Sequence, residues 1–242
     1  MSESLASYRT IWKQKPVLRI VYDDLFSRIA SRCVAGPTLE IGGGIGNLTG
    51  KIGGLISSDI QFAPWLDLVA DAQRLPFCDG AIGNIVMLDV LHHLEYPALL
   101  FREASRVLKP RGRLIMVEPA ITAGSTLFYR ILHQEPVRMN VDPLFEGTPD
   151  ENRDPYESNQ AIPTLIATSY REEFHRKFPE LTIRGIEWFS FIAYPFSGGF
   201  KPWCLISETV ARAVLRLEKH FERAIGRIFG FRLLLVIEKK LS

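Results

Sequence analysis

The chain has 242 residues, with 29 Lys or Arg against 27 Asp or Glu, which gives a formal net charge of +2. This near-neutral balance disfavours a protein that binds nucleic acid through bulk positive charge. Hydrophobic residues make up 47% and charged residues 23%, as in ordinary globular proteins, and a chain of this length can bury a full core without disulfides. We therefore expect a single domain.

The cysteines are Cys33, Cys78 and Cys204, an odd number at wide spacing. They exclude a fully paired disulfide framework and a CxxC metal knuckle, and we predict no metal site. The first twenty residues lack the pattern of a secretory signal, and no stretch reaches the roughly 18 apolar residues of a membrane span. We expect a reducing, cytoplasmic location.

Apolar runs of strand length alternate with stretches of helical period, which is typical of a parallel sheet flanked by helices. We predict an α/β fold, a doubly wound (Rossmann-like), mostly parallel seven-stranded sheet with helical insertions. A leading amphipathic helix is expected over residues 17–33, and further helices over 97–108 and 208–229. The expected strands are Thr38–Ile41, Leu55–Asp59, Leu68–Ala70, Ile85–Asp89, Arg113–Glu118, Leu181–Ser190 and Phe231–Lys239.

The expected domain has four segments. Residues 1–36 form a leading helical segment, and residues 37–119 form the core that carries the glycine-rich motif. Residues 120–180 contain several prolines and a polar stretch, so we expect an inserted lid there. Residues 181–242 hold the last two strands with an inserted helix.

The most informative segment is TLEIGGGIGNLT, residues 38–49, which follows the E-x-G-x-G-x-G pattern through Glu40, Gly42, Gly44 and Gly46. Glycines at the mouth of a strand-to-helix turn let the backbone approach a ligand closely. The segment fits neither the G-x-G-x-x-G of dinucleotide sites nor the phosphate-binding P-loop. The alternative is a tight turn without a ligand.

Two acids follow the next two predicted strands. Asp59 ends the second strand, where doubly wound folds place a carboxylate for ribose hydroxyls, and Asp71 follows the third. Carboxylates there suit an adenosine with a cationic tail better than an anionic dinucleotide. An Asp at a strand end is otherwise often a helix cap.

The stretches LEIGGGIGNLT, SSDI, DAQRLPFCDGAIGNIVMLDVLHHL and FREASRVLKPRGRLIMVEP, over about residues 38–119, resemble the class I S-adenosylmethionine-dependent methyltransferases, in particular the small-molecule (menaquinone and ubiquinone methyltransferase-like) group. The resemblance implies S-adenosylmethionine as cofactor. It places Glu40, Gly42, Gly44 and Gly46 at the methionine end, Asp59 at the ribose, Ile60 on the adenine, Asp71 and Ala72 at the adenine edge, and Asp89 beside the transferred methyl.

His93 and His92 follow the fourth strand and are the candidate general bases. The alternative is that this segment only begins a helix, and a base is dispensable for an acidic acceptor. His133 and Glu135 are weaker candidates. The N/D-P-P-Y/F run of enzymes that methylate amino groups is absent after the fourth strand, which disfavours a nucleic-acid acceptor.

The helix at 208–229 carries a basic stripe, Arg212, Arg216, Lys219, Arg223 and Arg227, nearly opposite an apolar stripe. We expect the apolar stripe to pack on the core and the basic stripe to be solvated; peripheral contact with an anionic membrane is the alternative. Phe128, Tyr129, Tyr194 and Trp203 are expected to wall the acceptor.

The predicted function is S-adenosylmethionine-dependent methyl transfer to a small-molecule or lipid-like acceptor at O or C. The competing hypothesis is a non-catalytic S-adenosylmethionine-binding or regulatory module. No prediction of oligomeric state follows from the sequence.

Overall fold

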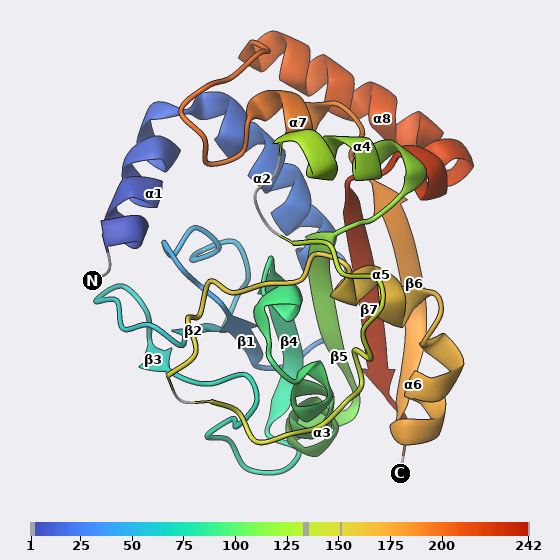
Figure 1. Ribbon diagram of the computed structural model, residues 1–242. Coiled ribbons are helices and arrows are strands. Elements are labelled where there is room, and N and C mark those ends of the chain that lie inside the picture. Colours follow the sequence, from blue (N-terminus) through green and yellow to red (C-terminus); the bar gives the residue numbers. More distant parts are fainter. Residues whose placement is uncertain (1–2, 133–135, 151, 242) are drawn as a thin grey trace.

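The computed structural model describes residues 3–132, 136–150 and 152–241. Its centre is a seven-stranded sheet in the order β3-β2-β1-β4-β5-β7-β6 (Figure 1). The strands are β1 (Thr38–Ile41), β2 (Leu55–Asp59), β3 (Leu68–Val69), β4 (Ile82–Leu88), β5 (Leu108–Pro119), β6 (Leu181–Phe189) and β7 (Arg232–Lys239). β7 pairs antiparallel with both β5 and β6, whereas the other pairings are parallel, so the predicted fold class is confirmed.

Helices cover both faces of the sheet (Figure 1). They are α1 (Glu3–Gln14), α2 (Pro16–Ala30), the 3₁₀ turn η1 (Leu91–His93), α3 (Pro97–Val107), α4 (Ala123–Leu132), α5 (Ile162–Ala167), α6 (Arg171–Lys177), α7 (Ala193–Ser197) and α8 (Glu208–Phe229). Among the described residues, no helix is both long and apolar enough to cross a membrane.

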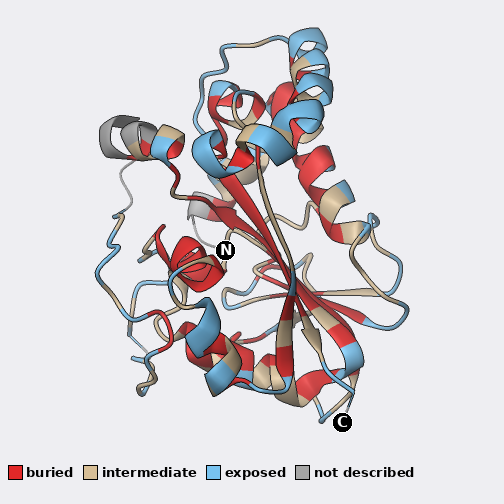
Figure 2. Cartoon of the chain, turned by 90° about the vertical axis from the view of Figure 1, so that its right-hand side faces the viewer, coloured by how far each residue is buried: buried red, intermediate tan, exposed pale blue. Residues whose placement is uncertain are grey.

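Two apolar layers enclose the sheet, because alternate side chains of a strand point to opposite faces. On β5, Leu114 and Met116 face the layer that includes α3 and α6, whereas Ile115 and Val117 face the layer built on α2. Strands covered on both sides read as continuous apolar runs, which is why the sequence reveals them. In Figure 2 the buried residues accordingly run along the strands.

The leading segment differs from the prediction, because it contains two helices where one was expected. Pro16 begins α2 at a position where its missing N–H is harmless, and α1 precedes it. The ring of Tyr8 on α1 lies 5.0 Å from that of Phe200, in the loop after α7. Lys15, at the junction of the two helices, donates to the carbonyls of Gly199 (2.6 Å) and Lys201 (2.8 Å). These contacts dock the N-terminal helices onto the segment that follows β6.

The predicted bounds of β4 and β5 were too narrow. Ile82 pairs with Leu108 and Asn84 with Arg113, so a bulge absorbs the Lys109–Gly112 stretch that we expected to separate helix from strand. Arg111 takes a φ of 63°, and the strand continues on both sides of the irregularity.

The prediction that the apolar stripe of α8 packs on the core was wrong. The buried residues of α8 are Ala211, Glu218 and Gly226. A Cβ added at Gly226 would lie 2.0 Å from the carbonyl oxygen of Trp188 on β6. Small residues allow this close approach, and they turn the large apolar residues of α8 away from the core.

Candidate active site

The predicted site residues gather at the carboxyl edge of the parallel strands. Gly42 follows β1, Asp59 ends β2, Asp89 follows β4 and Glu118 lies near the end of β5. Ligands of doubly wound folds bind at this edge.

The glycine-rich loop uses its glycines for different purposes. A Cβ at Gly42 would lie 2.2 Å from Cγ2 of Val90, and one at Gly46 would lie 2.8 Å from Cδ1 of Trp65, so the protein itself fills the space at both positions. At Gly44 the nearest atom would be the carbonyl oxygen of Gly42, at 3.9 Å. Gly44 is therefore the glycine of this motif whose missing side chain leaves room for a ligand.

Asp59 is fixed by the backbone around it. The amide of Gly44 donates to its Oδ2 and the amide of Gln61 to its Oδ1, each at 2.9 Å. A carboxylate oxygen accepts more than one hydrogen bond, so Asp59 retains capacity for ribose hydroxyls while it orients the glycine loop.

Glu40 is buried and accepts a hydrogen bond from the hydroxyl of Ser57. Burial raises the pKa of Glu40 to about 7, the Ser57 hydrogen bond opposes the rise, and the nearby Asp59 and Asp67 carboxylates add to it. Asp67 accepts from the amide of Ser57 at 2.8 Å. The sequence analysis missed Asp67. The sequence signal that could have indicated it is an acidic residue directly before the third predicted strand. Together the acids make this end of the site suited to a cation.

The expected adenine side carries exposed apolar side chains. Ile60 is 53% exposed, and Phe62 and Val69 are likewise exposed. Asp71 accepts from the amide of Gln73 at 2.8 Å, whereas the side chain of Ala72 is buried in the core. An exposed apolar surface beside Asp59 is the environment that a flat base covers.

Trp65, in the short connection after β2, lies on the glycine loop. Its indole Nε1 donates to the carbonyl of Gly44 at 2.8 Å, and the guanidinium of Arg9 on α1 lies 3.9 Å from the ring centroid. Helix α1 therefore contacts two regions: Arg9 lies on Trp65 beside the glycine loop, and Tyr8 packs against Phe200.

Asp89 makes an ion pair that the sequence did not reveal. Nη2 of Arg232, at the start of β7, donates to Oδ2 of Asp89 at 3.0 Å, and Nη1 donates to Oδ1. The guanidinium stacks 3.9 Å from the Tyr194 ring centroid and is only 2% exposed. Asp89 holds a φ of 58°, so this pair fixes a strained residue at the end of β4.

His92 forms a buried dyad with Glu118. Nδ1 of His92 lies 2.6 Å from Oε2 of Glu118, whose Oε1 accepts from the amides of Val90 (2.9 Å) and Leu91 (2.8 Å). Because both amides donate to Oε1, Oε2 is the oxygen that faces the ring, and a proton on Nδ1 of His92 would be donated to it. Sequence analysis missed Glu118, although it ends the apolar run of the fifth predicted strand.

His93 has different surroundings. Its Nδ1 lies 3.3 Å from the carbonyl oxygen of Glu157, and its own carbonyl accepts from Arg153 at 2.6 Å. His93 thus connects η1 to the segment before α5. His133 and Glu135 lie outside the described residues.

Asp89, His92 and Glu118 offer ligand atoms within 4.8 Å of one another, the one such cluster among the described residues. Arg232 already neutralises Asp89, and Glu118 is occupied by two amides and His92. The arrangement therefore suits orientation of an imidazole and a carboxylate better than it suits a cation.

The expected acceptor wall is only partly assembled. Tyr194 lies against Arg232 in the site, whereas Tyr129 is buried against Phe231, at 6.2 Å between ring centroids. Trp203 is 41% exposed. The side chain of Phe128 lies outside the described residues.

Residues 39–116 match the family model described as a methyltransferase domain. Among curated proteins no match was found. The fold resembles a SAM-dependent methyltransferase from Archaeoglobus fulgidus, at 15% identity over 92% of this chain and 94% of that one, with a TM-score of 0.52. It also resembles a SAM-dependent methyltransferase from Thermotoga maritima, at 16% identity over 93% and 91%, with a TM-score of 0.50. At these identities the likeness shows the fold.

The sheet order and the family match define a doubly wound α/β enzyme of the methyltransferase type. Residues 39–116 match a methyltransferase domain, and the chain has the fold of S-adenosylmethionine-dependent methyltransferases, so S-adenosylmethionine is the cofactor that the domain implies. Its own residues fit that group: open space at Gly44, acceptors at Asp59, exposed Ile60, and acids for the positive charge.

Proposed function

We propose that this enzyme methylates a small-molecule or lipid-like acceptor at an acidic O–H or C–H group, with His92 as general base and Glu118 as its positioning residue. The observation that carries the proposal is the 2.6 Å contact between His92 Nδ1 and Glu118 beside Asp89. The contact supports a tautomer with the proton on Nδ1, and the proposal assigns Nε2 as the ring atom that takes the acceptor's proton. It also favours His92 over His93.

The cofactor-binding part of the proposal assigns Glu40, Gly42, Gly44 and Gly46 to the methionine end. It assigns Asp59 and Ile60 to the nucleoside, and Asp71 and Ala72 to the adenine edge. The exposed surface at Ile60 and the acceptors of Asp59 support these roles.

The cofactor supplies an electrophilic methyl group. With the cofactor bound, its sulfur–methyl bond would break as the acceptor–methyl bond formed, and Nε2 of His92 would take the acceptor's proton. Glu118 stabilises the resulting imidazolium through Nδ1, and Arg232 keeps Asp89 in place at the end of β4. Positioning and exclusion of water supply the rest of the rate.

The test measures release of the demethylated cofactor with two probe acceptors, a catechol and a 1,3-diketone. His92→Ala should lower turnover about 100-fold or more with cofactor affinity kept, while His93→Ala should lower it little. Glu118→Gln should lower turnover and shift the pH profile, because an amide no longer stabilises the charged ring. Normal turnover in His92→Ala would refute the assignment.

The proposal retains the cytoplasm as the place of action and no nucleic-acid partner. The cysteine side chains Cys33, Cys78 and Cys204 are unpaired thiols, which agrees with a reducing compartment.

A further inference from the structure

Helix α8 has three rows of side chains. The inward row, Ala211, Glu218 and Gly226, packs on β6 and α7. Glu218 is held there because its Oε1 accepts from the amides of Ile192 (2.5 Å) and Ala193 (3.0 Å). This attachment fixes which way the other two rows point.

One outward row is the apolar face of α8, which contains Val210, Val214, Leu217, Phe221, Ile225 and Ile228. Leu217 is 59% exposed and Phe221 50%. The adjacent α7 and the residues on either side of it add further exposed apolar side chains, namely Ile192, Phe196, Trp203 and Leu205. A contiguous apolar surface of this kind marks an interaction site.

A groove of about 390 Å³ runs along this face. Its lining includes Val214, Leu217 and Phe221 of α8, Gly124 of α4, and Phe231. Phe231 directly precedes Arg232, which holds Asp89. The groove therefore lies between α8, α4 and the start of β7, and it is lined mainly by apolar side chains.

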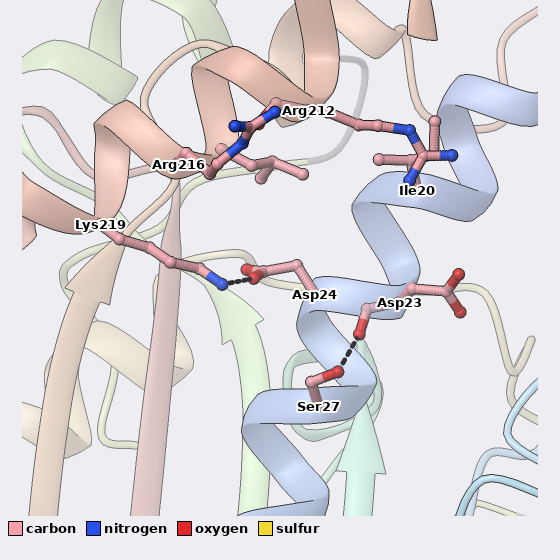
Figure 3. Close-up of a pocket in the computed structure, with 8 residues that line it drawn as sticks. Ile20, Asp23, Asp24, Ser27, Arg212, Arg216 and Lys219 are labelled. Atoms are coloured by element: carbon pink, nitrogen blue, oxygen red, sulfur yellow. Dashed lines mark hydrogen bonds and ion pairs between the residues drawn. The ribbon is translucent and has the colours of Figure 1, made fainter. Parts of the chain in front are cut away.

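The second outward row is the basic row of α8, formed by Arg212, Arg216, Lys219, Arg223 and Arg227. It lies nearly opposite the apolar face, and its members Arg212, Arg216 and Lys219 border α2 (Figure 3). Lys219 is anchored to Asp24 on α2, with 2.6 Å between Nζ and Oδ1. The side chains of Arg212 and Arg216 line a groove of about 320 Å³ between the two helices. The row thus presents several cations on the same exposed helix as the apolar face.

We infer that the apolar face and basic row of α8 form a docking surface for a membrane rich in anionic lipids. A helix with Phe and Leu on one side and Arg and Lys on the other binds in the plane of the interface. The charge decides between occupants: a row of five cations repels the same row of a second copy, whereas anionic headgroups complement it. An acceptor drawn from that membrane is a corollary, and it rests on the proposed function.

The experiment is sedimentation of the full chain with vesicles of phosphatidylglycerol and phosphatidylcholine, and with phosphatidylcholine alone. The chain should sediment with the anionic vesicles at low salt and be released at high salt, because salt screens the attraction. Leu217→Ser combined with Phe221→Ser should weaken binding at least about tenfold, because it removes buried apolar area. Leu241→Ser, an equally exposed apolar position at the C-terminal end, is the control and should bind like the parent.

A charge series gives the second arm. Arg223→Glu with Arg227→Glu should weaken binding at least about tenfold, since each basic residue near the surface contributes roughly fivefold. Arg171→Glu with Arg176→Glu makes the same charge change on exposed positions of α6 and should leave binding unchanged. Equal loss in both pairs would mean unspecific attraction and would overturn the inference.

Light scattering and cofactor calorimetry on the same samples separate the remaining outcomes. Absence of binding to anionic vesicles at low salt overturns the inference, and a dimer that dissociates in the serine variant would assign the apolar face to a second copy. Retained cofactor binding and turnover in either case would leave the proposed function standing. Binding to anionic vesicles together with normal turnover in His92→Ala would support the docking surface and refute the proposed role of His92.

Discussion

Gly44 and Gly50 provide a matched pair for testing the cofactor site at the scale of one residue. Both have positive φ, 48° and 78°, and a Cβ at either position meets no close atom of the protein. A change to Val therefore costs both positions comparable backbone strain. We expect Gly44→Val to abolish binding of S-adenosylmethionine in calorimetry and Gly50→Val to preserve it. Equal affinity in the two variants would move the methionine end away from Gly44.

Asp59 tests the nucleoside side of the same site. Asp59→Ala removes the acceptor of two backbone amides and the proposed ribose contact. Charge-assisted hydrogen bonds contribute about 1.5–3 kcal/mol, so cofactor affinity should fall roughly 10- to 100-fold. The control is Asp79→Ala, because that carboxylate makes only an exposed ion pair with Arg106. A loss of affinity confined to Asp79→Ala would contradict the assignment.

Glu40 should make cofactor binding depend on pH. Its pKa of about 7 means that the carboxylate is largely protonated at pH 6 and largely ionised at pH 8. A cationic cofactor favours the ionised form, so affinity should rise about tenfold over this interval. Glu40→Gln should flatten the dependence, as measured by calorimetry at constant ionic strength.

The raised pKa of Glu40 affects folding stability in the opposite direction from cofactor affinity: stability falls as pH rises. Because the folded-state pKa lies above the ordinary value of 4.5, the folded protein binds the proton more tightly than the unfolded chain does. The Glu40 contribution therefore favours folding at low pH and is lost as pH rises from 4.5 through about 7. Glu40→Gln should be less sensitive to pH in this window by chemical denaturation. An unchanged slope would show that Glu40 keeps its ordinary pKa.

At the scale of the elements, Gly226 decides how α8 attaches. Ala is the better helix former by about 1 kcal/mol, so Gly226→Ala would stabilise an open position. Here the added Cβ would lie 2.0 Å from a backbone oxygen of β6, which cannot move aside as a side chain can. We expect a net loss of roughly 2 kcal/mol in chemical denaturation. Ala224→Gly, at an exposed position of the same helix, should lose only about 1 kcal/mol. A stabilised Gly226→Ala variant would contradict this packing.

Helix α8 also shows what periodicity can and cannot predict. Its bounds follow from the sequence, because the Ser207 hydroxyl caps its first turn and Gly230 follows its last residue. Its orientation does not, because an amphipathic pattern says that two faces differ but not which face meets the protein. The inward row consists of Ala211, Glu218 and Gly226. None of these is a large apolar residue, so the hydrophobic pattern of the sequence does not indicate that this side of the helix is buried. Similarly, α1 packs through scattered aromatic residues such as Tyr8, which leave a weak pattern.

The site divides in the same way. The proximity of Gly44 and Asp59 was predictable, because the neighbouring parallel strands β1 and β2 bring their carboxyl ends together. Arg232 was not, because its role depends on the antiparallel insertion of β7 next to β5. The sequence places Glu118 at the end of the fifth predicted strand. Its contact with His92 could not be predicted, because it depends on how the η1 turn orients the histidine.

At the scale of the whole molecule, the Arg232–Asp89 pair ties the parallel part of the sheet to β7. Arg232 is almost fully buried, whereas the side chain of Asp89 is 27% exposed. Losing one partner of a buried pair costs stability because the other charge is left uncompensated. The two single substitutions should therefore differ. Asp89→Asn leaves a buried cation, whereas Arg232→Met leaves an anion that water can reach.

We expect Asp89→Asn to lower the free energy of unfolding by about 3–5 kcal/mol, and Arg232→Met to lower it by less. The double variant should lose less than the sum of the two, because no unpaired charge remains. Denaturant unfolding of all four proteins measures this cycle, with the ion pair between exposed side chains, Lys51 and Asp23, as the control. The corresponding cycle at that pair should give at most about 1 kcal/mol. If Arg232→Met proved the more costly change, Arg232 would act mainly through its stacking on Tyr194 and its packing in the sheet, and the charge of Asp89 would be free to serve the reaction.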